Sequence, residues 1–149
     1  MLVHAFNWKK MSLCAALAYR AQARRLFFAL RPGSFDTPGL IGFLEELRTE
    51  LRGAHLTLVW DGLPAHRSLQ MQAYLRAQRR WLVVERLPGY APELNPVESL
   101  WQNVKGRELA NYCGTSLATM ASQCRRGLRR VRRRPSLLSS FLRHAGLFM

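Results

Sequence analysis

Residues 81–101 read WLVVERLPGYAPELNPVESLW and combine a strand, a proline-containing loop and the start of a helix. Five of the first seven residues, WLVVERL, are apolar and the segment is β-rich, which predicts a short strand. Residues 87–96 carry three prolines and a glycine and predict a loop. Asn95 and Pro96 are typical of the N-cap and the first position of a helix, which we expect to continue to about Asn111.

A second strand and a connecting helix precede this stretch. Residues 55–61, HLTLVWD, form a short apolar run next to glycines, which predicts a buried strand that ends in the carboxylate of Asp61. The residues from His66 to Arg79 predict a helix between the two strands. The order strand, helix, strand is typical of an α/β protein with a sheet at its centre.

Two more strands and another helix are expected nearer the N-terminus. The apolar runs MSLCAALAY at 11–19 and RRLFFALR at 24–31 fit two antiparallel strands, although their alanines also allow a helix. Thr37 and Pro38 are typical of an N-cap and a first helical position. Apolar residues then repeat at helical spacing as far as Gly53, which predicts a helix over this segment.

Two helices, over Ser116–Arg133 and Pro135–His144, complete the predicted elements. A chain of 149 residues is long enough for one domain with its own core. The sequence therefore predicts a single α/β domain with a helical C-terminus.

The charge of the chain indicates its partner. Lys and Arg number 23 against 9 Asp and Glu, which gives a net charge of +14. Such an excess attracts polyanions, and nucleic acid fits better than an anionic membrane surface. No run approaches the roughly 20 apolar residues that cross a bilayer, so we expect a cytoplasmic protein without membrane contact. Cys14, Cys113 and Cys124 have no paired spacing, which argues against a disulfide framework or a zinc site.

Asp61 is the first candidate for a chemical role, because α/β proteins bind ligands beyond the carboxyl ends of their strands. A turn-forming Asp-Gly pair explains the same residue about equally well. His66 and Arg67 add polar and cationic groups nearby. Solvation of a helix end is the simpler explanation for either of them taken singly.

Glu98 is the second candidate. Asn95 followed by Glu three residues later is a capping-box arrangement, in which the carboxylate bonds back to the amide of the cap. The proline-containing loop also fixes Glu98 in space and would allow it to face Asp61 across the end of the sheet. Opposed carboxylates attract divalent cations, and Mg²⁺ held by carboxylates and phosphates is the arrangement of two-metal phosphodiester chemistry.

Two strings, VWDGLPAHRS and LPGYAPELNPVESLWQNVKGREL, resemble the second and third acidic motifs of the insertion-sequence-630 and mariner superfamily of transposases. The second motif of that family is an aspartate at a strand end with a histidine five residues later, as at Asp61 and His66. The third is a loop with proline and tyrosine that leads into Asn-Pro-x-Glu and a later Trp, as in residues 90–101. Thirty-six residues lie between Asp61 and Glu98, near the family's spacing. The likeness extends through FNWKKMSLCAALAY and RPGSFD to RHAGL.

The resemblance implies an α/β, ribonuclease-H-like mixed sheet with flanking helices and an Asp, Asp, Glu/Asp triad. That triad binds two Mg²⁺ (or Mn²⁺) ions. Asp61 and Glu98 would then be catalytic and metal-binding, the DNA partner would be transposon ends and target, and the complete enzyme would be a homodimer. The family's first aspartate lies on the first, central strand, before the segment that resembles FNWKKMSL. We expect this aspartate and this strand to be absent here. Asp36 does not replace the aspartate, because it lies where the family has a structural loop.

The resemblance also divides the chain. We expect residues 1–112 to form a truncated catalytic domain and residues 113–149 a helical, arginine-rich extension of the same domain. The arginines from 125 to 134 cover too much of a helix to be one solvated stripe, which favours a phosphate-binding surface. Trp101 fits a core position better than DNA stacking. The expected DNA-binding residues are His66, Arg67, Tyr90, Lys105, Arg125, Arg126, Arg129, Arg130, Arg132 and Arg133.

The sequence thus predicts the C-terminal portion of a DDE transposase, inactive alone and associated with the bacterial nucleoid. An upstream transposase fragment is a further expected partner. Two alternatives stay open. One is a non-catalytic, basic nucleic-acid-binding protein, and the other is a decayed transposon remnant.

Overall fold

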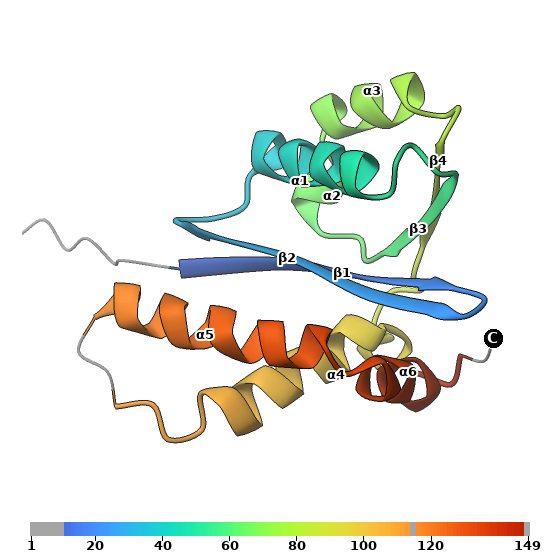
Figure 1. The fold of residues 1–149 in the computed structure, drawn as a ribbon. Coiled ribbons are helices and arrows are strands. Elements are labelled where there is room, and N and C mark those ends of the chain that lie inside the picture. Colours follow the sequence, from blue (N-terminus) through green and yellow to red (C-terminus); the bar gives the residue numbers. More distant parts are fainter. Residues whose placement is uncertain (1–10, 114–115, 148–149) are drawn as a thin grey trace, which may run out of the picture.

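A hairpin of two long strands lies between two layers of helices (Figure 1). The computed structural model describes residues 11–113 and 116–147 of the chain. The segment FNWKK at 6–10, which belongs to the family resemblance, lies outside the described residues.

The hairpin consists of β1 (Met11–Arg20) and β2 (Ala23–Pro32), which are antiparallel as predicted. Successive side chains of a strand point to opposite faces, and here both faces are apolar. Leu17 and its cross-strand partner Leu26 contact one core, whereas Phe27, the next residue of β2, belongs to the other. Helices on both sides of the hairpin cover these two apolar faces (Figure 1).

The helix α1 (Thr37–Glu50) packs on the face of the hairpin that carries Phe27, but its predicted N-cap was wrong by one residue. Oδ1 of Asp36 accepts the hydrogen bond of the Gly39 amide at 2.9 Å, so Asp36 is the cap. Oγ1 of Thr37 instead lies 2.9 Å from Oγ of Ser68. Asp and Thr are both good caps, and the tertiary partner of Thr37 decides between them.

The strands β3 (Leu56–Trp60) and β4 (Leu82–Arg86) are parallel, with Leu58 opposite Val84. Asp61 directly follows β3, as the sequence predicts. Parallel neighbours need a crossover connection, which is the role of the segment between them.

That crossover is two helices, α2 (Pro64–Arg67) and α3 (Leu69–Ala77), and not the single helix predicted over 66–79. The break falls at Ser68, whose backbone is extended and whose Oγ accepts a hydrogen bond from the amide of Met71 at 3.1 Å. A serine in a capping role ends one helix and starts the next.

The four strands form two separate two-stranded sheets, β1–β2 and β3–β4, as expected of a ribonuclease-H-like sheet that lacks its first, central strand. Both sheets contribute side chains to one core, in which Phe27 and Leu82 pack with Leu44 of α1 and Met71 of α3. Within residues 11–113 and 116–147, no strand is hydrogen-bonded to both sheets.

The helix predicted from Asn95 to Asn111 begins at the expected residue but changes its geometry. Asn95 caps α4 (Pro96–Asn103), and one π-helical turn, η2 (Val104–Glu108), follows. Gly106 lies in that turn, and glycine weakens a regular α-helix. The preceding loop also contains one 3₁₀ turn, η1 (Pro92–Leu94).

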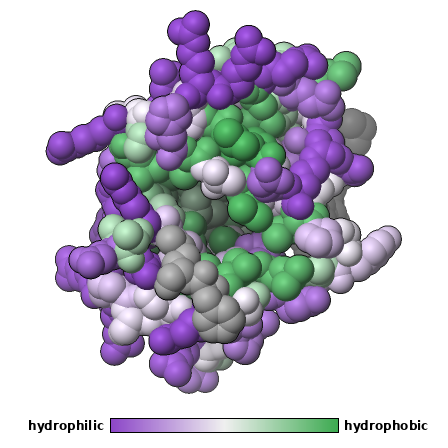
Figure 2. Space-filling view, turned by 90° about the vertical axis from the view of Figure 1, so that its right-hand side faces the viewer, coloured by the Kyte–Doolittle hydropathy of each residue, from purple (hydrophilic) through white to green (hydrophobic). Residues whose placement is uncertain are grey.

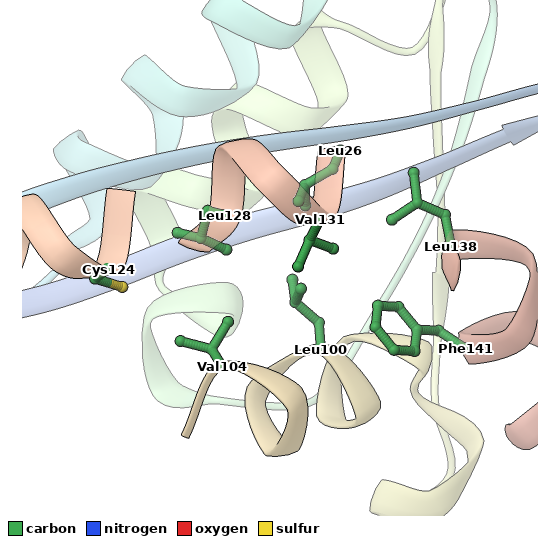
Figure 3. Close-up of a cluster of buried hydrophobic side chains, with 8 residues drawn as sticks. All are labelled: Leu26, Leu100, Val104, Cys124, Leu128, Val131, Leu138 and Phe141. Carbon is green, nitrogen blue, oxygen red and sulfur yellow. The ribbon is translucent and has the colours of Figure 1, made fainter. Parts of the chain in front are cut away.

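The last two helices, α5 (Leu117–Arg132) and α6 (Pro135–His144), agree with the sequence prediction. Together with α4 they cover the second face of the hairpin and enclose the core drawn in Figure 3. Its side chains point toward one another from β2, α4, η2, α5 and α6, and they are Leu26, Leu100, Val104, Cys124, Leu128, Val131, Leu138 and Phe141. Of the helices described, none is long and apolar enough to span a bilayer.

Candidate active site

The carboxylate of Asp61 lies just beyond the end of β3 and is about half exposed, at 46%. Its Oδ1 accepts a hydrogen bond from the amide of Leu63 at 3.2 Å, which is the turn geometry expected of an Asp-Gly pair. The same Oδ1 lies 2.9 Å from Nδ1 of His66. Among the described residues, none donates to Oδ2 of Asp61, so this oxygen is open to a further ligand.

The imidazole of His66 is held on two sides. It stacks on the indole of Trp60, with ring centres 4.1 Å apart and planes 3° from parallel. Its Nδ1 also lies 3.0 Å from the backbone carbonyl oxygen of Asp61. Only 12% of the His66 side chain is exposed. The sequence motif predicts that Asp61 and His66 are close, but it gives no sign of the stack on Trp60.

Glu98 lies in the first turn of α4 and is partly buried. The capping box that competes with a chemical role for this residue is not formed. The amide of Asn95 donates to the carbonyl oxygen of Pro92 at 2.9 Å, and Oδ1 of Asn95 accepts from the amide of Val97 at 3.1 Å. The cap is therefore complete without the carboxylate of Glu98.

Tyr90 is fully exposed in the loop before α4, and its backbone is left-handed at φ 60°. A residue other than glycine pays a steric cost for this conformation. The loop thus presents an aromatic ring to solvent at a strained position, which is common where a side chain has a binding role.

The donor set for a metal ion is incomplete within the described chain. No three His, Cys, Asp or Glu side chains among residues 11–113 and 116–147 come together as metal ligands. Asp61 fits a divalent cation by its chemistry, since one of its oxygens is fixed and the other is open. A complete metal site needs ligands in addition to Asp61.

The basic residues of α5 lie opposite its buried face. Ala121, Cys124, Leu128 and Val131 are buried, and the arginines between them are exposed. At about 100° per residue, the side chains of Arg125, Arg126, Arg129 and Arg133 fall within an arc of roughly 100°. We call these four residues the arginine stripe.

Two arginines of the same segment have internal partners. Arg130 forms an ion pair with Glu108 of η2, whose side chain is only 11% exposed. Arg132 donates from Nε to the carbonyl oxygen of Leu26 at 3.0 Å, and its guanidinium lies 4.6 Å from the ring centre of Phe28. Both side chains connect α5 to its neighbours, a role that the density of arginines in the sequence conceals.

The remaining predicted site residues occupy different surroundings. Arg67 is exposed at the end of α2, beside His66. Lys105 is exposed on η2 at the edge of an apolar pocket of about 340 Å³. Trp101 is partly buried against the core of Figure 3 and lines the same pocket, which agrees with its expected core position.

The fold is ribonuclease-H-like, as comparison with solved structures indicates. Three solved structures of the Mos1 transposase catalytic domain are similar: two with Raltegravir and Mg or Mn, and one crystal structure described as that of the Mos1 mariner transposase. Each has a TM-score of 0.52 and 13% sequence identity, and covers 93% of this chain and 83% or 84% of the other.

Residues 4–116, which are most of the chain, match the model of the DDE superfamily endonucleases. The chain therefore belongs to the DDE superfamily endonuclease family, and the likeness to mariner transposases predicted from its motifs is confirmed. No curated protein sequence matches it.

Proposed function

We propose that this chain forms part of the catalytic domain of a DDE transposase, in which Asp61 and Glu98 are two of three metal-binding carboxylates. The observation that supports this most is the geometry of Asp61. It lies at the carboxyl end of β3, where α/β folds bind ligands, with Oδ1 fixed by two contacts and Oδ2 open. Glu98 supports it as well, because its helix is capped without it.

The metal expected here is Mg²⁺ or Mn²⁺, with two ions in the complete enzyme. When bound, such ions activate the attacking oxygen and stabilise the charge on the scissile phosphate. The chain contributes the ligands and their placement. Asp61 is held by its turn, and Glu98 is held by the proline-containing loop and the first turn of α4.

DNA, as transposon ends and target, is the substrate that the charge of the chain favours. The arginine stripe of α5 offers guanidinium groups to the backbone phosphates, and Arg67, Tyr90 and Lys105 are exposed on other elements. A transposase with this charge would associate with the nucleoid and act as a dimer on its two DNA ends.

The third carboxylate and a central strand would come from an additional transposase segment. Each sheet has two strands, and β1 and β3 each have one edge without a strand partner among the described residues. A strand placed between these edges would join the two sheets into one and bring a carboxylate to the site. In its absence we expect the chain to be inactive.

Paramagnetic broadening by Mn²⁺ tests the paired carboxylates directly. In ¹⁵N-labelled chain, Mn²⁺ should broaden the amides around Asp61 and those in the first turn of α4 together, and Asp61→Asn should abolish both effects. The matched control is Asp36→Asn, since Asp36 is a helix cap and should leave the broadening unchanged. Broadening at one carboxylate alone, or persistence in Asp61→Asn, would contradict the proposal.

A non-catalytic, basic nucleic-acid-binding protein is the second candidate. The incomplete donor set among the described residues favours it. This candidate predicts that the chain binds DNA but holds no Mn²⁺ at Asp61 and Glu98. The Mn²⁺ experiment therefore separates the two functions.

A further inference from the structure

The contacts of His66 converge on one residue. Its Nδ1 faces two oxygens of Asp61, the backbone carbonyl at 3.0 Å and Oδ1 at 2.9 Å. A carbonyl oxygen only accepts hydrogen bonds, so Nδ1 must carry the hydrogen. The hydrogen bond of Nδ1 runs to the backbone carbonyl, and Oδ1 lies beside the same nitrogen, so the imidazole restricts the rotation of the Asp61 side chain.

The ring of His66 is itself restrained. The stack on Trp60 fixes the plane of the imidazole, and the low exposure of the side chain leaves little room for rotation. Trp60 is the last residue of β3 and packs against the core shared by the two sheets. The position of the imidazole is therefore set by the sheet.

The short helix that carries His66 is also anchored. Ser68, directly after α2, is hydrogen-bonded through Oγ to Oγ1 of Thr37 at 2.9 Å, at the start of α1. Pro64 fixes the backbone at the first position of α2. The contact of Ser68 with α1 therefore anchors the C-terminal end of α2, two residues beyond His66.

We propose that His66 is a positioning residue: held by Trp60, it donates from Nδ1 to Asp61 and keeps Oδ2 of that carboxylate turned toward the metal site. This inference rests on the proposed role of Asp61 as a metal ligand. Substitution of a residue that is hydrogen-bonded to a metal ligand typically lowers the metal affinity by roughly 10- to 100-fold. His66 acts through Asp61 and needs no contact with the metal or with DNA.

The tautomer of His66 tests the contact without any metal. Long-range ¹H–¹⁵N NMR at a pH where the imidazole is neutral should show the hydrogen on Nδ1. A neutral ring with the hydrogen on Nε2 would overturn the proposal, because such a ring cannot donate to Asp61.

Three substitutions test the consequence, with the apparent Mn²⁺ affinity read from amide broadening in the full chain. His66→Asn keeps an N–H near the position of Nδ1 and should stay within roughly threefold of wild type. His66→Gln places its N–H near Nε2, and His66→Leu has none, so both should bind Mn²⁺ about tenfold more weakly. His55→Gln, at an exposed histidine, is the control and should have no effect.

The pattern across variants keeps the two proposals separate. If Asp61→Asn lost the Mn²⁺ broadening while His66→Gln and His66→Leu bound Mn²⁺ with wild-type affinity, only the role of His66 would be overturned. Unchanged broadening in Asp61→Asn would overturn the metal site itself. The dispersion of the amide signals shows whether the Gln and Leu variants are folded. If the folded His66→Asn variant bound Mn²⁺ as weakly as the Gln and Leu variants do, this would also contradict a positioning role.

Discussion

Arg132 of α5 donates a hydrogen bond from Nε to the carbonyl oxygen of Leu26 in β2, across 106 positions of sequence. Its guanidinium also lies over the ring of Phe28. A planar guanidinium combines these two contacts, which a lysine ammonium does not. One residue of the arginine-dense segment therefore holds the C-terminal helices on the hairpin.

Replacement of this residue should lower stability. We expect Arg132→Ala to reduce the free energy of unfolding by about 2 kcal/mol, which is typical of the loss of a hydrogen bond to a charged group. Urea denaturation measures this change. Arg133→Ala is the matched control and should change stability by less than about 0.5 kcal/mol, because Arg133 is an exposed residue. Equal effects of the two substitutions would remove the structural role of Arg132.

The arginine stripe should determine how DNA affinity depends on salt. Each phosphate that a protein neutralises adds roughly 0.9 to the slope of log affinity against log salt. Replacing Arg125, Arg126, Arg129 and Arg133 with Ala should therefore flatten the slope by up to about 3.6. Fluorescence anisotropy of labelled DNA over a salt series measures it. An unchanged slope would mean that the stripe is only a solvated surface.

Gly127 should be needed for the contact between α5 and η2. A Cβ on this residue would lie 2.5 Å from Cγ and 2.8 Å from Cβ of Glu108, so η2 itself would have to move. We expect Gly127→Ala to cost about 1–3 kcal/mol of stability, as overpacking does. Gly106→Ala, where nothing lies within 4 Å of the added carbon, is the control and should be neutral or slightly stabilising. Thermal unfolding of the two variants measures this difference in stability.

Local signals in the sequence predict most of the elements. The strands β1 to β4, the cap at Asn95 and the bounds of α6 all follow from turn residues, proline positions and apolar periodicity. These features depend on neighbours a few residues apart. Even the errors are local, since the cap at Asp36 and the break at Ser68 lie within a few residues of the predicted bounds.

Features that depend on distant partners could not be predicted. The stack of His66 on Trp60 requires the path of α2, and the contact of Arg132 with Leu26 requires the packing of α5 on the hairpin. Asp61 and Glu98 could be proposed as a pair from the sequence because the spacing of a family motif records a tertiary arrangement indirectly.

Partly buried thiol and phenol groups should make the fold sensitive to alkaline pH, and Cys14 and Tyr19 are two of them. Burial raises the pKa of the Cys14 thiol from 9.0 to about 12 and the pKa of Tyr19 from 10.0 to about 12. Both groups are neutral when protonated, and in each case the folded-state pKa exceeds the unfolded one. Their stabilisation is therefore complete below about pH 9 and is lost as the pH rises toward 12.

Urea denaturation at a series of pH values between 8 and 11 measures this loss. Cys14→Ala should flatten the decline from about pH 9, and Tyr19→Phe should flatten it from about pH 10. Cys113→Ala removes an exposed thiol and serves as the control. A decline that is the same in all three variants would assign the alkaline sensitivity to other groups.

The free edges of β1 and β3 should accept one additional strand, and hydrogen exchange can follow it amide by amide. In an antiparallel hairpin, every second amide of β1 points toward β2 and the others point away. We expect alternating protection along β1 in the chain alone, together with a tendency to aggregate through the exposed edges.

A transposase segment that carries an aspartate on an apolar strand, fused or added in trans, should protect the outward amides of β1 and β3 at the same time. It should also restore solubility and Mg²⁺-dependent nicking of DNA, and Asp61→Asn should then abolish nicking while DNA binding remains. Nicking by the chain alone that is lost in Asp61→Asn would contradict this account, because the ligands present would then suffice for the chemistry.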